Sequence, residues 1–168
     1  MNKAENPPKV RLATPLDNEA IRAIYNLEVT NSTATLDMVE RSEIDQSKWL
    51  DLHSGIYPAL VCEINGKVAG FGSLSPYRDR PGYSGTVEDS VYVAHCARRQ
   101  GVGEAILIEL VNLGAAHGFH SILAMVGGGG EPSIYLHTKC GFEIVGVERQ
   151  VGRKHGKWID VTIMQRLL

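Results

Sequence analysis

The amino-acid sequence predicts an α/β fold, with a mixed central β-sheet and helices on both of its faces. Extended and helical segments follow one another over 168 residues in the order β-α-α-β-β-β-α-β-α-β-β, and interleaved helices favour parallel strand pairs. Hairpin signals at 65–66 and 152–157 add antiparallel pairs. A sheet with both kinds of pair is mixed, and we expect a single domain over 1–168.

The bulk composition excludes several classes of protein. Hydrophobic residues make up 43% and charged residues 21%, as in ordinary globular chains, and a net charge of −2 gives no bulk attraction to nucleic acid. Cys62, Cys96 and Cys140 are odd in number and far apart, which indicates reduced thiols in a cytoplasmic protein, without a disulfide framework or a metal site. No apolar run is long enough for a membrane span, and we expect residues 1–8 to be a loose lead-in without a signal peptide.

The first two elements have clear local signals. Residues 10–13 alternate between apolar and polar side chains, which predicts a strand. Thr14 then offers an N-cap and Pro15 a first helical position. The helix that follows has apolar residues at helical spacing: Ala20, Ile21, Ile24 and Tyr25.

A second helix follows a polar break at 31–35. Ser42 and Asp45 have the spacing of a capping box, so the helix should begin near Ser42, and Gly55 should end it. We expect its core-facing side chains to be Ile44, Trp49 and Leu52.

The next segment is a hairpin followed by a loop. Asn65-Gly66 separates strands at 59–64 and 67–74, and both turn residues tolerate the positive φ of a tight turn. The loop at 76–85 is rich in tyrosine and arginine.

Residues 86–117 form the stretch around which the chain is organised. A strand at 86–93 leads to a cationic loop, the glycine turn Arg-Arg-Gln-Gly-Val-Gly at 98–103, and a long helix that closes at Gly118. The helix carries one apolar stripe: Val102, Ile106, Leu110 and Leu113. Glycines expose backbone N–H groups, and a helix N-terminus adds its positive dipole end, so the turn should hold a phosphate or pyrophosphate.

The last elements complete the sheet. Residues 121–126 are a buried strand, 127–130 are four glycines in a flexible turn, and Pro132 starts a helix that ends at Cys140-Gly141. Residues 142–151 and 158–166 are the final strand pair, joined through the turn at 152–157.

The glycine turn fits some phosphate sites better than others. The P-loop string Gly-x-x-x-x-Gly-Lys-Ser/Thr is absent, and a dinucleotide motif would need a third glycine where Ile106 stands. The pattern Arg/Gln-x-x-Gly-x-Gly of a coenzyme A site is met by Arg98, Gly101 and Gly103. Taken alone, the six residues 98–103 are as consistent with a plain strand-to-helix turn as with a coenzyme A site.

Several longer motifs carry a family resemblance. They are Ile24-Tyr25-Asn26, NSTAT at 31–35, TVEDSVYV at 86–93, SIYLH at 133–137, CGF at 140–142, KHGKW at 154–158 and Asp160-Val161. Over 10–168 the chain resembles the GNAT superfamily of acetyl-CoA-dependent N-acetyltransferases. It is most similar to the branch that acetylates phosphinothricin and methionine sulfoximine or sulfone, which confers resistance to such analogues.

The resemblance implies that acetyl-CoA lies where two neighbouring parallel strands splay apart, and that no metal takes part. The backbone of 91–93 would bind the pantetheine arm, and the turn at 99–104 would bind the pyrophosphate. The implied cofactor contacts are Val91, Tyr92, Val93, Arg98, Arg99, Gln100, Gly101, Val102, Gly103, Glu104, Gly130 and Ser133. Branch members usually have asparagine at Gly130, so cofactor affinity is open.

The chemistry implied is attack of an amine on a thioester after the ammonium loses a proton. Glu88 is the candidate base, on one strand face with Ser90 and Tyr92; the alternative is a strand carboxylate held in an ion pair or exposed at the sheet edge. His137 is a second candidate proton carrier, and Tyr135 could protonate the leaving thiolate. Helix phase separates these two side chains, so only one should face inward.

The resemblance also implies an amino-acid pocket. Arginine binds carboxylates through paired hydrogen bonds, so the loop before the strand is a candidate carboxylate site, sometimes completed across a homodimer. The implied substrate contacts are Leu36, Arg78, Asp79, Arg80, Tyr83, Glu88, Asp89 and Ser90. Leu36 replaces a usual aromatic residue, which leaves side-chain preference open.

We therefore expect an enzyme that acetylates the α-amino group of a small amino acid or analogue by direct attack, without a covalent acetyl-enzyme. The alternatives are acetylation of protein or peptide amines, and a non-catalytic sensor of acyl-CoA. No nucleic-acid or membrane partner is expected.

Overall fold

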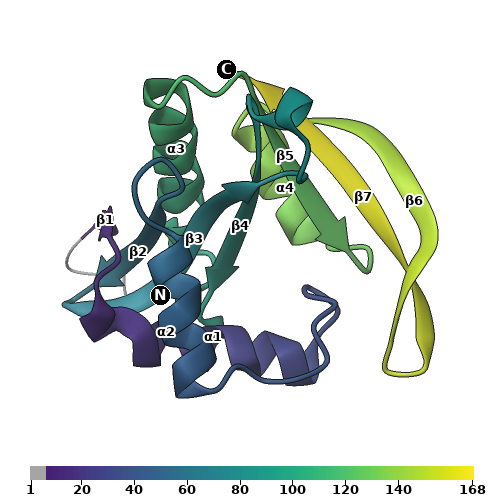
Figure 1. Cartoon of the computed structure of the whole chain (residues 1–168). Helices are drawn as coiled ribbons and strands as arrows, with labels where there is room; N and C mark the ends of the chain where they lie inside the picture. The colour runs from purple at the N-terminus through teal and green to yellow at the C-terminus, as the bar shows by residue number, and fades with distance from the viewer. Residues whose placement is uncertain (1–6) are drawn as a thin grey trace.

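The computed structural model describes residues 7–168, which form a seven-stranded mixed sheet (Figure 1). Its order is β1-β2-β3-β4-β5-β7-β6, and the pair β4–β5 is parallel while the other strand pairs of the described residues are antiparallel. Residues 1–6, which hold most of the predicted lead-in, lie outside the described part. The strands are β1 Lys9–Leu12, β2 Ala59–Ile64, β3 Lys67–Pro76, β4 Thr86–Val93, β5 Ser121–Gly127, β6 Glu143–Lys154 and β7 Lys157–Leu167.

Four α-helices pack on this sheet. They are α1 Asn18–Asn31, α2 Glu43–Leu52, α3 Val102–Ala116 and α4 Glu131–Lys139, with single 3₁₀ turns at Pro15–Asp17, Pro81–Tyr83 and His95–Ala97. The predicted order of helices and strands is confirmed. Within residues 7–168, none of the helices combines the length and apolarity that spanning a bilayer would take.

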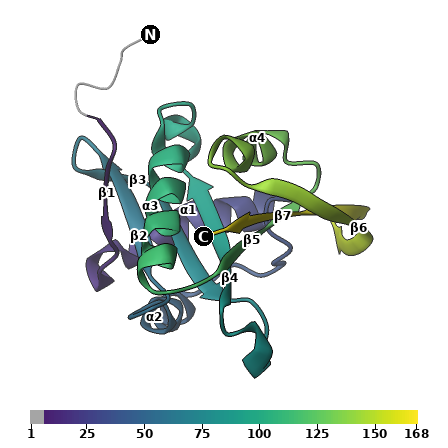
Figure 2. The ribbon, with the colours of Figure 1, turned by 90° about the horizontal axis from the view of Figure 1, so that it is seen from above.

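The helices cover opposite faces of the sheet because side chains alternate along each strand. On β3, a Cβ at Gly72 would meet Ile106 of α3, whereas the neighbouring Phe71 packs edge-on against Trp49 of α2, with ring centroids 5.8 Å apart. Figure 2 shows α2 and α4 on different sides of the strands. The face of α3 and α4 is called the helix-3 face below, and the other the helix-1 face.

Both hairpins form, and the second is tighter than predicted. Asn65 and Gly66 have φ of 52° and 74°, as expected for the first turn. In the second, β6 and β7 pair up to Lys154 opposite Lys157, so the turn is His155-Gly156 rather than the six residues 152–157. Two adjacent residues with positive φ, 49° and 74°, are sufficient for the reversal.

The second helix begins as predicted but turns a different side to the core. The Ser42 side chain accepts a hydrogen bond from the Asp45 backbone N–H, which completes the capping box. Ile44 and Leu52 are 67% and 75% exposed, so their predicted core positions are wrong. The buried residues are Gln46 and Leu50. These two residues are four positions apart and share one face of the helix. Because one of them is the amide Gln46, a search for apolar spacing does not find this face.

The parallel pair β4–β5 separates part-way along its length. Its register runs from Thr86 opposite Ser121 to Asp89 opposite Ala124. Beyond that point 90–93 stay paired with β3, and 125–127 stay paired with β7, but the two segments no longer pair with each other. This gap, called the fork below, is the splayed strand pair that the resemblance implied.

Replacing Gly72 with alanine should destabilise the fold. Its Cβ would lie 2.5 Å from Ile106 Cγ2 and 2.9 Å from the Ser90 carbonyl oxygen, because α3 packs directly on the β3 backbone. We expect Gly72→Ala to lower the free energy of unfolding by about 1–3 kcal/mol in urea titrations. Gly146→Ala, where no atom lies within 4 Å, is the matched control and should cost nothing. Equal midpoints for the two variants would contradict the close packing.

Candidate functional site

The mouth of the fork is flanked by two helix N-termini. Helix α3 follows β4 through Gly101, whose φ of 82° permits the turn, and α4 follows β5 through Gly130. Backbone N–H groups at the first turns of both helices therefore point toward the carboxyl ends of the two parallel strands. The structure gathers a predicted set here: Val91, Tyr92, Val93, Gly101, Val102, Gly103, Gly130 and Ser133. The arrangement suits an elongated ligand with an anionic end.

Two glycines at this mouth lie close to the side chains of neighbouring elements. A Cβ at Gly103 would lie 3.0 Å from Leu136 Cδ2 of α4, and one at Gly130 would lie 2.9 Å from Val126 Cγ1 of β5. A side chain at Gly130 would therefore require Val126 of β5 to shift in this chain. Its hydrogen-bonding contribution to a ligand is limited to backbone groups.

The cationic loop is already engaged with protein partners. Arg98 Nη2 donates to Glu28 Oε1 at 2.7 Å, and His95 Nε2 lies 2.7 Å from the same oxygen. Glu28 is 4% exposed and belongs to α1. The motif alone suggested that Arg98 binds a phosphate. In the structure its guanidinium group is instead hydrogen-bonded to α1. Its side chain remains 52% exposed.

Two other side chains of the turn are also hydrogen-bonded to protein groups. Glu104 accepts a hydrogen bond from Lys139 Nζ at 2.6 Å, which joins α3 to α4, and Gln100 donates to the Cys96 carbonyl. Arg99 is exposed with φ of 63° and makes no ion pair within residues 7–168. It is the cation of the turn that stays available for an anion.

Glu88 lies on the helix-1 face of β4, at the closed part of the strand pair. Burial raises the pKa of its carboxyl group, and the charge of Asp89 raises it further. No hydrogen bond or ion pair holds the side chain within the described residues, so the alternative of an ion-paired strand carboxylate is not what the structure shows. A partly buried, unpaired carboxyl with a raised pKa is suited to accept a proton near neutral pH.

Ser75 on β3 lies directly opposite Glu88, and it is held by a histidine. His53 Nδ1 lies 2.6 Å from the Trp49 carbonyl oxygen and must donate to it, and Nε2 lies 2.9 Å from Ser75 Oγ. Burial lowers the pKa of His53, which favours the neutral ring, so Nε2 accepts the Ser75 hydroxyl proton. Ser75 Oγ then retains acceptor capacity toward the space beside Glu88.

An aromatic wall continues the helix-1 face toward the fork. The Tyr92 ring lies 5.1 Å from that of Tyr25 and 5.2 Å from that of Phe71. The Tyr25 hydroxyl donates to Asp37 Oδ2 at 2.6 Å and lies 3.0 Å from Thr35 Oγ1. These contacts position the loop between α1 and α2 beside β4.

The same loop is fastened to the β6–β7 hairpin by a buried lysine. Lys154 is 2% exposed, and its Nζ donates to the carbonyl oxygens of Thr35 at 2.7 Å and Glu28 at 3.4 Å. Leu36 packs on Gly152, where a Cβ would lie 2.6 Å from Leu36 Cδ1. Leu36 was predicted to line the substrate side chain. Its position is set by the Lys154 bond to the preceding residue and by its packing on Gly152, and it is 39% exposed.

Asp89 points to the helix-3 face, away from Glu88, because adjacent strand residues alternate. Its Oδ2 lies 3.0 Å from His137 Nε2 of α4, and the two residues are 5% and 4% exposed. Of the two residues predicted to line the pocket near the amine, Asp89 thus contacts His137 on the helix-3 face, and Ser90, two residues on from Glu88, shares the face of Glu88.

One of the two candidate proton carriers of α4 faces inward, as expected from helix phase. His137 is buried, and the Tyr135 side chain is 72% exposed. Burial alone would lower the pKa of His137, but the hydrogen bond and charge of Asp89 raise it. Tyr135 turns away from the fork, so the structure does not support it as the acid for the leaving group.

The arginine loop lies at the other end of β4 from the fork. Arg78 stacks over Tyr77 and Tyr83, with its guanidinium carbon 4.8 Å and 5.6 Å from the ring centroids. Asp79 and Arg80 are exposed, and the loop projects from the body of the molecule (Figure 2). Neither arginine has an acidic partner within residues 7–168.

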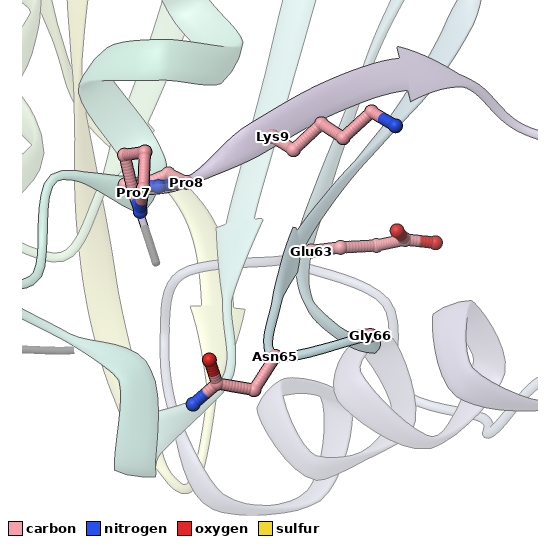
Figure 3. A pocket seen from close by; sticks show the side chains of 6 residues that line it. All are labelled: Pro7, Pro8, Lys9, Glu63, Asn65 and Gly66. Carbon is pink, nitrogen blue, oxygen red and sulfur yellow. The ribbon is translucent and has the colours of Figure 1, made fainter. Parts of the chain in front are cut away.

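A separate surface hollow of about 480 Å³ lies near the start of β1 and the β2–β3 turn (Figure 3). Pro7, Pro8, Lys9, Glu63, Asn65 and Gly66 line it. Lys9 and Glu63 extend side by side and do not converge with Asn65 on a common point. The hollow contains none of the predicted site residues.

Sequence reasoning missed the residues that support the site from other elements. His53 and Ser75 meet across 22 positions, and Lys154 and Thr35 across 119. The KHGKW motif did mark Lys154, but no local pattern shows that its ammonium group is buried. Within the described residues no group of three or more potential metal ligands occurs.

Lys154→Met should destabilise the protein and loosen the 32–37 loop. Methionine keeps the apolar stem but leaves the Thr35 carbonyl without its donor, at a cost of about 1–3 kcal/mol in the free energy of unfolding. Hydrogen exchange of the Asp37 amide should also quicken. Lys157→Met, on the exposed side of the same hairpin, is the control and should change neither. Normal stability of Lys154→Met would show that the lysine does not fasten the loop.

Comparison with known proteins agrees with this geometry. The family model for the acetyltransferase (GNAT) domain matches residues 10–163. An L-methionine sulfoximine/L-methionine sulfone acetyltransferase of Pseudomonas aeruginosa is 39% identical over 93% of this chain and 92% of its own. A phosphinothricin acetyltransferase of Sinorhizobium meliloti, solved in complex with AcCoA, has a TM-score of 0.93 and 36% identity, covering 97% and 89% of the two chains. A ribosomal-protein-alanine N-acetyltransferase from Brucella melitensis has a TM-score of 0.93 and 37% identity, covering 95% and 99%. The chain belongs to the GNAT family of acetyltransferases.

Proposed function

We propose that the protein transfers the acetyl group of acetyl-CoA to the α-amino group of a small amino acid or analogue, such as methionine sulfoximine, methionine sulfone or phosphinothricin. The observation that carries this proposal is an unpaired, partly buried Glu88 on the strand that forms one arm of the fork. The names of the similar enzymes support the substrate class.

The fork has the features that acetyl-CoA needs. Residues 91–93 lie in the part of β4 that no longer pairs with β5, where backbone groups on that side can bond the pantetheine as a neighbouring strand would. The N-terminal turn of α3 with Gly101 and Arg99 would hold the pyrophosphate, and the first turn of α4 with Ser133 would face the same groove. When bound, acetyl-CoA supplies the activated acetyl thioester.

Glu88 would accept a proton from the substrate ammonium, directly or through water. Ser75 Oγ, opposite it, would accept a second N–H bond and orient the amine. Ser90 and Tyr92 continue the same face toward the fork, and Leu36 would limit the side-chain pocket. On the other face, His137 would supply a proton to the departing thiolate, and the backbone N–H near Val93 would stabilise charge on the acetyl oxygen.

We propose further that the protein works as a homodimer in the cytoplasm. Arg78 and Arg80 project from the end of β4 without acidic partners, so a second copy could bring them to a substrate carboxylate. Cys62, Cys96 and Cys140 are free thiols, as is usual in a reducing compartment.

The similar ribosomal-protein-alanine N-acetyltransferase favours a second candidate, acetylation of peptide N-termini. Peptides extend beyond the α-carboxylate and would gain nothing from arginines placed to bind it. The two candidates therefore differ in how they respond to a free carboxylate.

Thiol release from acetyl-CoA across a panel of amines tests the proposal. Free amino acids, methionine sulfoximine, methionine sulfone and phosphinothricin should react with higher kcat/KM than their amides, by about 10-fold or more, because a charged hydrogen-bond partner is lost. Alanine-initiated peptides are the comparison. Preference for peptides would replace the proposal with the second candidate, and acetyl-CoA binding without any thiol release would indicate a sensor.

Glu88→Gln should lower kcat by about 10²–10⁴-fold while acetyl-CoA still binds, because the amide cannot accept the proton. In the wild type, kcat/KM should rise with pH as Glu88 loses its proton, with a midpoint above the ordinary glutamate pKa. That rise should disappear in the variant. Glu143→Gln, an exposed change on β6, is the control. Unchanged turnover in Glu88→Gln would remove Glu88 from the mechanism.

A further inference from the structure

Acetyl transfer to an ammonium group removes two protons from one nitrogen. The substrate group R–NH3⁺ has three N–H bonds, and the amide product keeps one of them. Glu88 holds one proton at a time, so it would have to discharge to solvent between the two transfers. A second proton acceptor beside Glu88 removes that wait.

Ser75 of β3 is placed to contact the same nitrogen as Glu88. The two residues lie directly opposite each other in the antiparallel β3–β4 pair, so their side chains share the helix-1 face, with Cβ atoms about 5 Å apart. Both side chains are partly exposed. Within residues 7–168, the Ser75 hydroxyl makes one hydrogen bond, and its partner is His53.

His53, which directly follows α2, is held in one orientation. Its Nδ1 lies 2.6 Å from the Trp49 carbonyl oxygen, one of those that a helix C-terminus leaves without an intrahelical donor. Its ring also stacks on the Trp49 indole, with centroids 4.2 Å apart. A carbonyl only accepts, so Nδ1 carries the hydrogen, and the lone pair of Nε2 faces Ser75 Oγ at 2.9 Å.

We propose that Ser75 and His53 form a second proton route from the substrate amine. Ser75 touches the nitrogen, and His53 is the positioning residue that orients the Ser75 hydroxyl and receives its proton. The hydroxyl donates to Nε2, which leaves the lone pairs of Oγ free to accept an N–H bond. A nucleophile or amine, a hydroxyl and an oriented base in this order are a known arrangement for proton removal. The substrate in this route rests on the proposed function.

The step balances in atoms and charge. Glu88 takes the first proton, and the neutral amine attacks the thioester carbon. As the C–N bond forms, the N–H bond toward Ser75 breaks and a new Oγ–H bond forms. The original Oγ–H bond breaks, and an Nε2–H bond forms on His53. The C–S bond then breaks, so that acetyl-CoA and R–NH3⁺ give the amide, CoA–SH and one proton released to solvent.

The surroundings of His53 suit a proton that stays only briefly. Burial lowers its pKa, the hydrogen bond to the Trp49 carbonyl opposes this, and the charge of Arg41, which precedes α2, lowers the pKa further. From β3 the ring meets Ser75, and Glu88 of β4 lies beyond that hydroxyl. The ring is therefore neutral before the reaction, and it returns an acquired proton to solvent readily.

The first test reads the hydrogen positions on the His53 ring, in the full chain without ligand. Long-range ¹H–¹⁵N spectra at pH 7 should show a hydrogen on Nδ1 and none on Nε2, with His53→Leu used to assign the signals among six histidines. A hydrogen on Nε2, in either the other tautomer or the imidazolium, would overturn the proposal, because Nε2 could not then receive the Ser75 proton. This measurement is independent of any amine substrate.

The second test is kinetic. Ser75→Ala and His53→Leu should each lower kcat by about 10- to 100-fold, with an unchanged KM for acetyl-CoA, because Glu88 must then discharge between two transfers. The double variant should be no slower than the single ones, since the two residues act as a unit. Ser75→Thr keeps the hydroxyl and should restore most of kcat. Single-turnover rates in H2O–D2O mixtures should curve with deuterium content in the wild type, where two protons move together, and be linear in Ser75→Ala.

Ser54→Ala and His117→Leu are the matched controls. The Ser54 hydroxyl donates to the Asp51 carbonyl, and His117 Nδ1 lies 3.1 Å from the Ile56 carbonyl oxygen, so neither bonds to Ser75. Both variants should keep the wild-type kcat.

The outcomes separate this route from the proposed function. If the wild type acetylates an amine but Ser75→Ala is as fast, or is slow without relief in Ser75→Thr, the route is overturned and the proposed function stands. If the wild type acetylates no amine, the proposed function fails and the route fails with it, whatever the hydrogen positions on His53.

Discussion

The end of β4–β5 pairing at Asp89 and Ala124 is the constraint on which the site depends. Parallel strands need connections that cross the sheet, and here each connection returns as a helix whose N-terminus meets the carboxyl end of the strand before it. When the strands part, two helix N-termini and two unpaired strand edges surround one gap. Unpaired backbone groups in such a gap need a partner, and an extended amide-containing ligand can provide it.

Side-chain alternation then divides the chemistry between the two faces of β4. Glu88, Ser90 and Tyr92 face α1 and α2, and Asp89 faces α4. The Glu88 carboxyl and the His137 ring are therefore separated by a single strand. Each is tuned by its own surroundings, since burial raises the pKa of Glu88 and Asp89 raises that of His137. Both pKa shifts are upward, and each has its own physical cause.

Long-range polar contacts hold the loops that complete the site. Glu28 of α1 accepts a hydrogen bond from Arg98 of the glycine turn through its side chain, and its carbonyl accepts from Lys154 of β6. One residue thus connects the turn before α3 with the hairpin that fastens the loop carrying Leu36.

The sequence by itself determined the element order, the capping box at Ser42, the Asn65-Gly66 turn and the gathering of the glycine turn with the end of β4. These follow from local rules, because turn φ values, caps and apolar periodicity act over a few residues. Only the tertiary structure decided that Gln46 is buried and Ile44 exposed, that Tyr135 faces solvent, that Arg98 binds Glu28, and that Asp89 contacts His137. Those outcomes depend on which face another element covers, and partners 48 to 119 residues apart leave no local pattern from which the contact can be deduced.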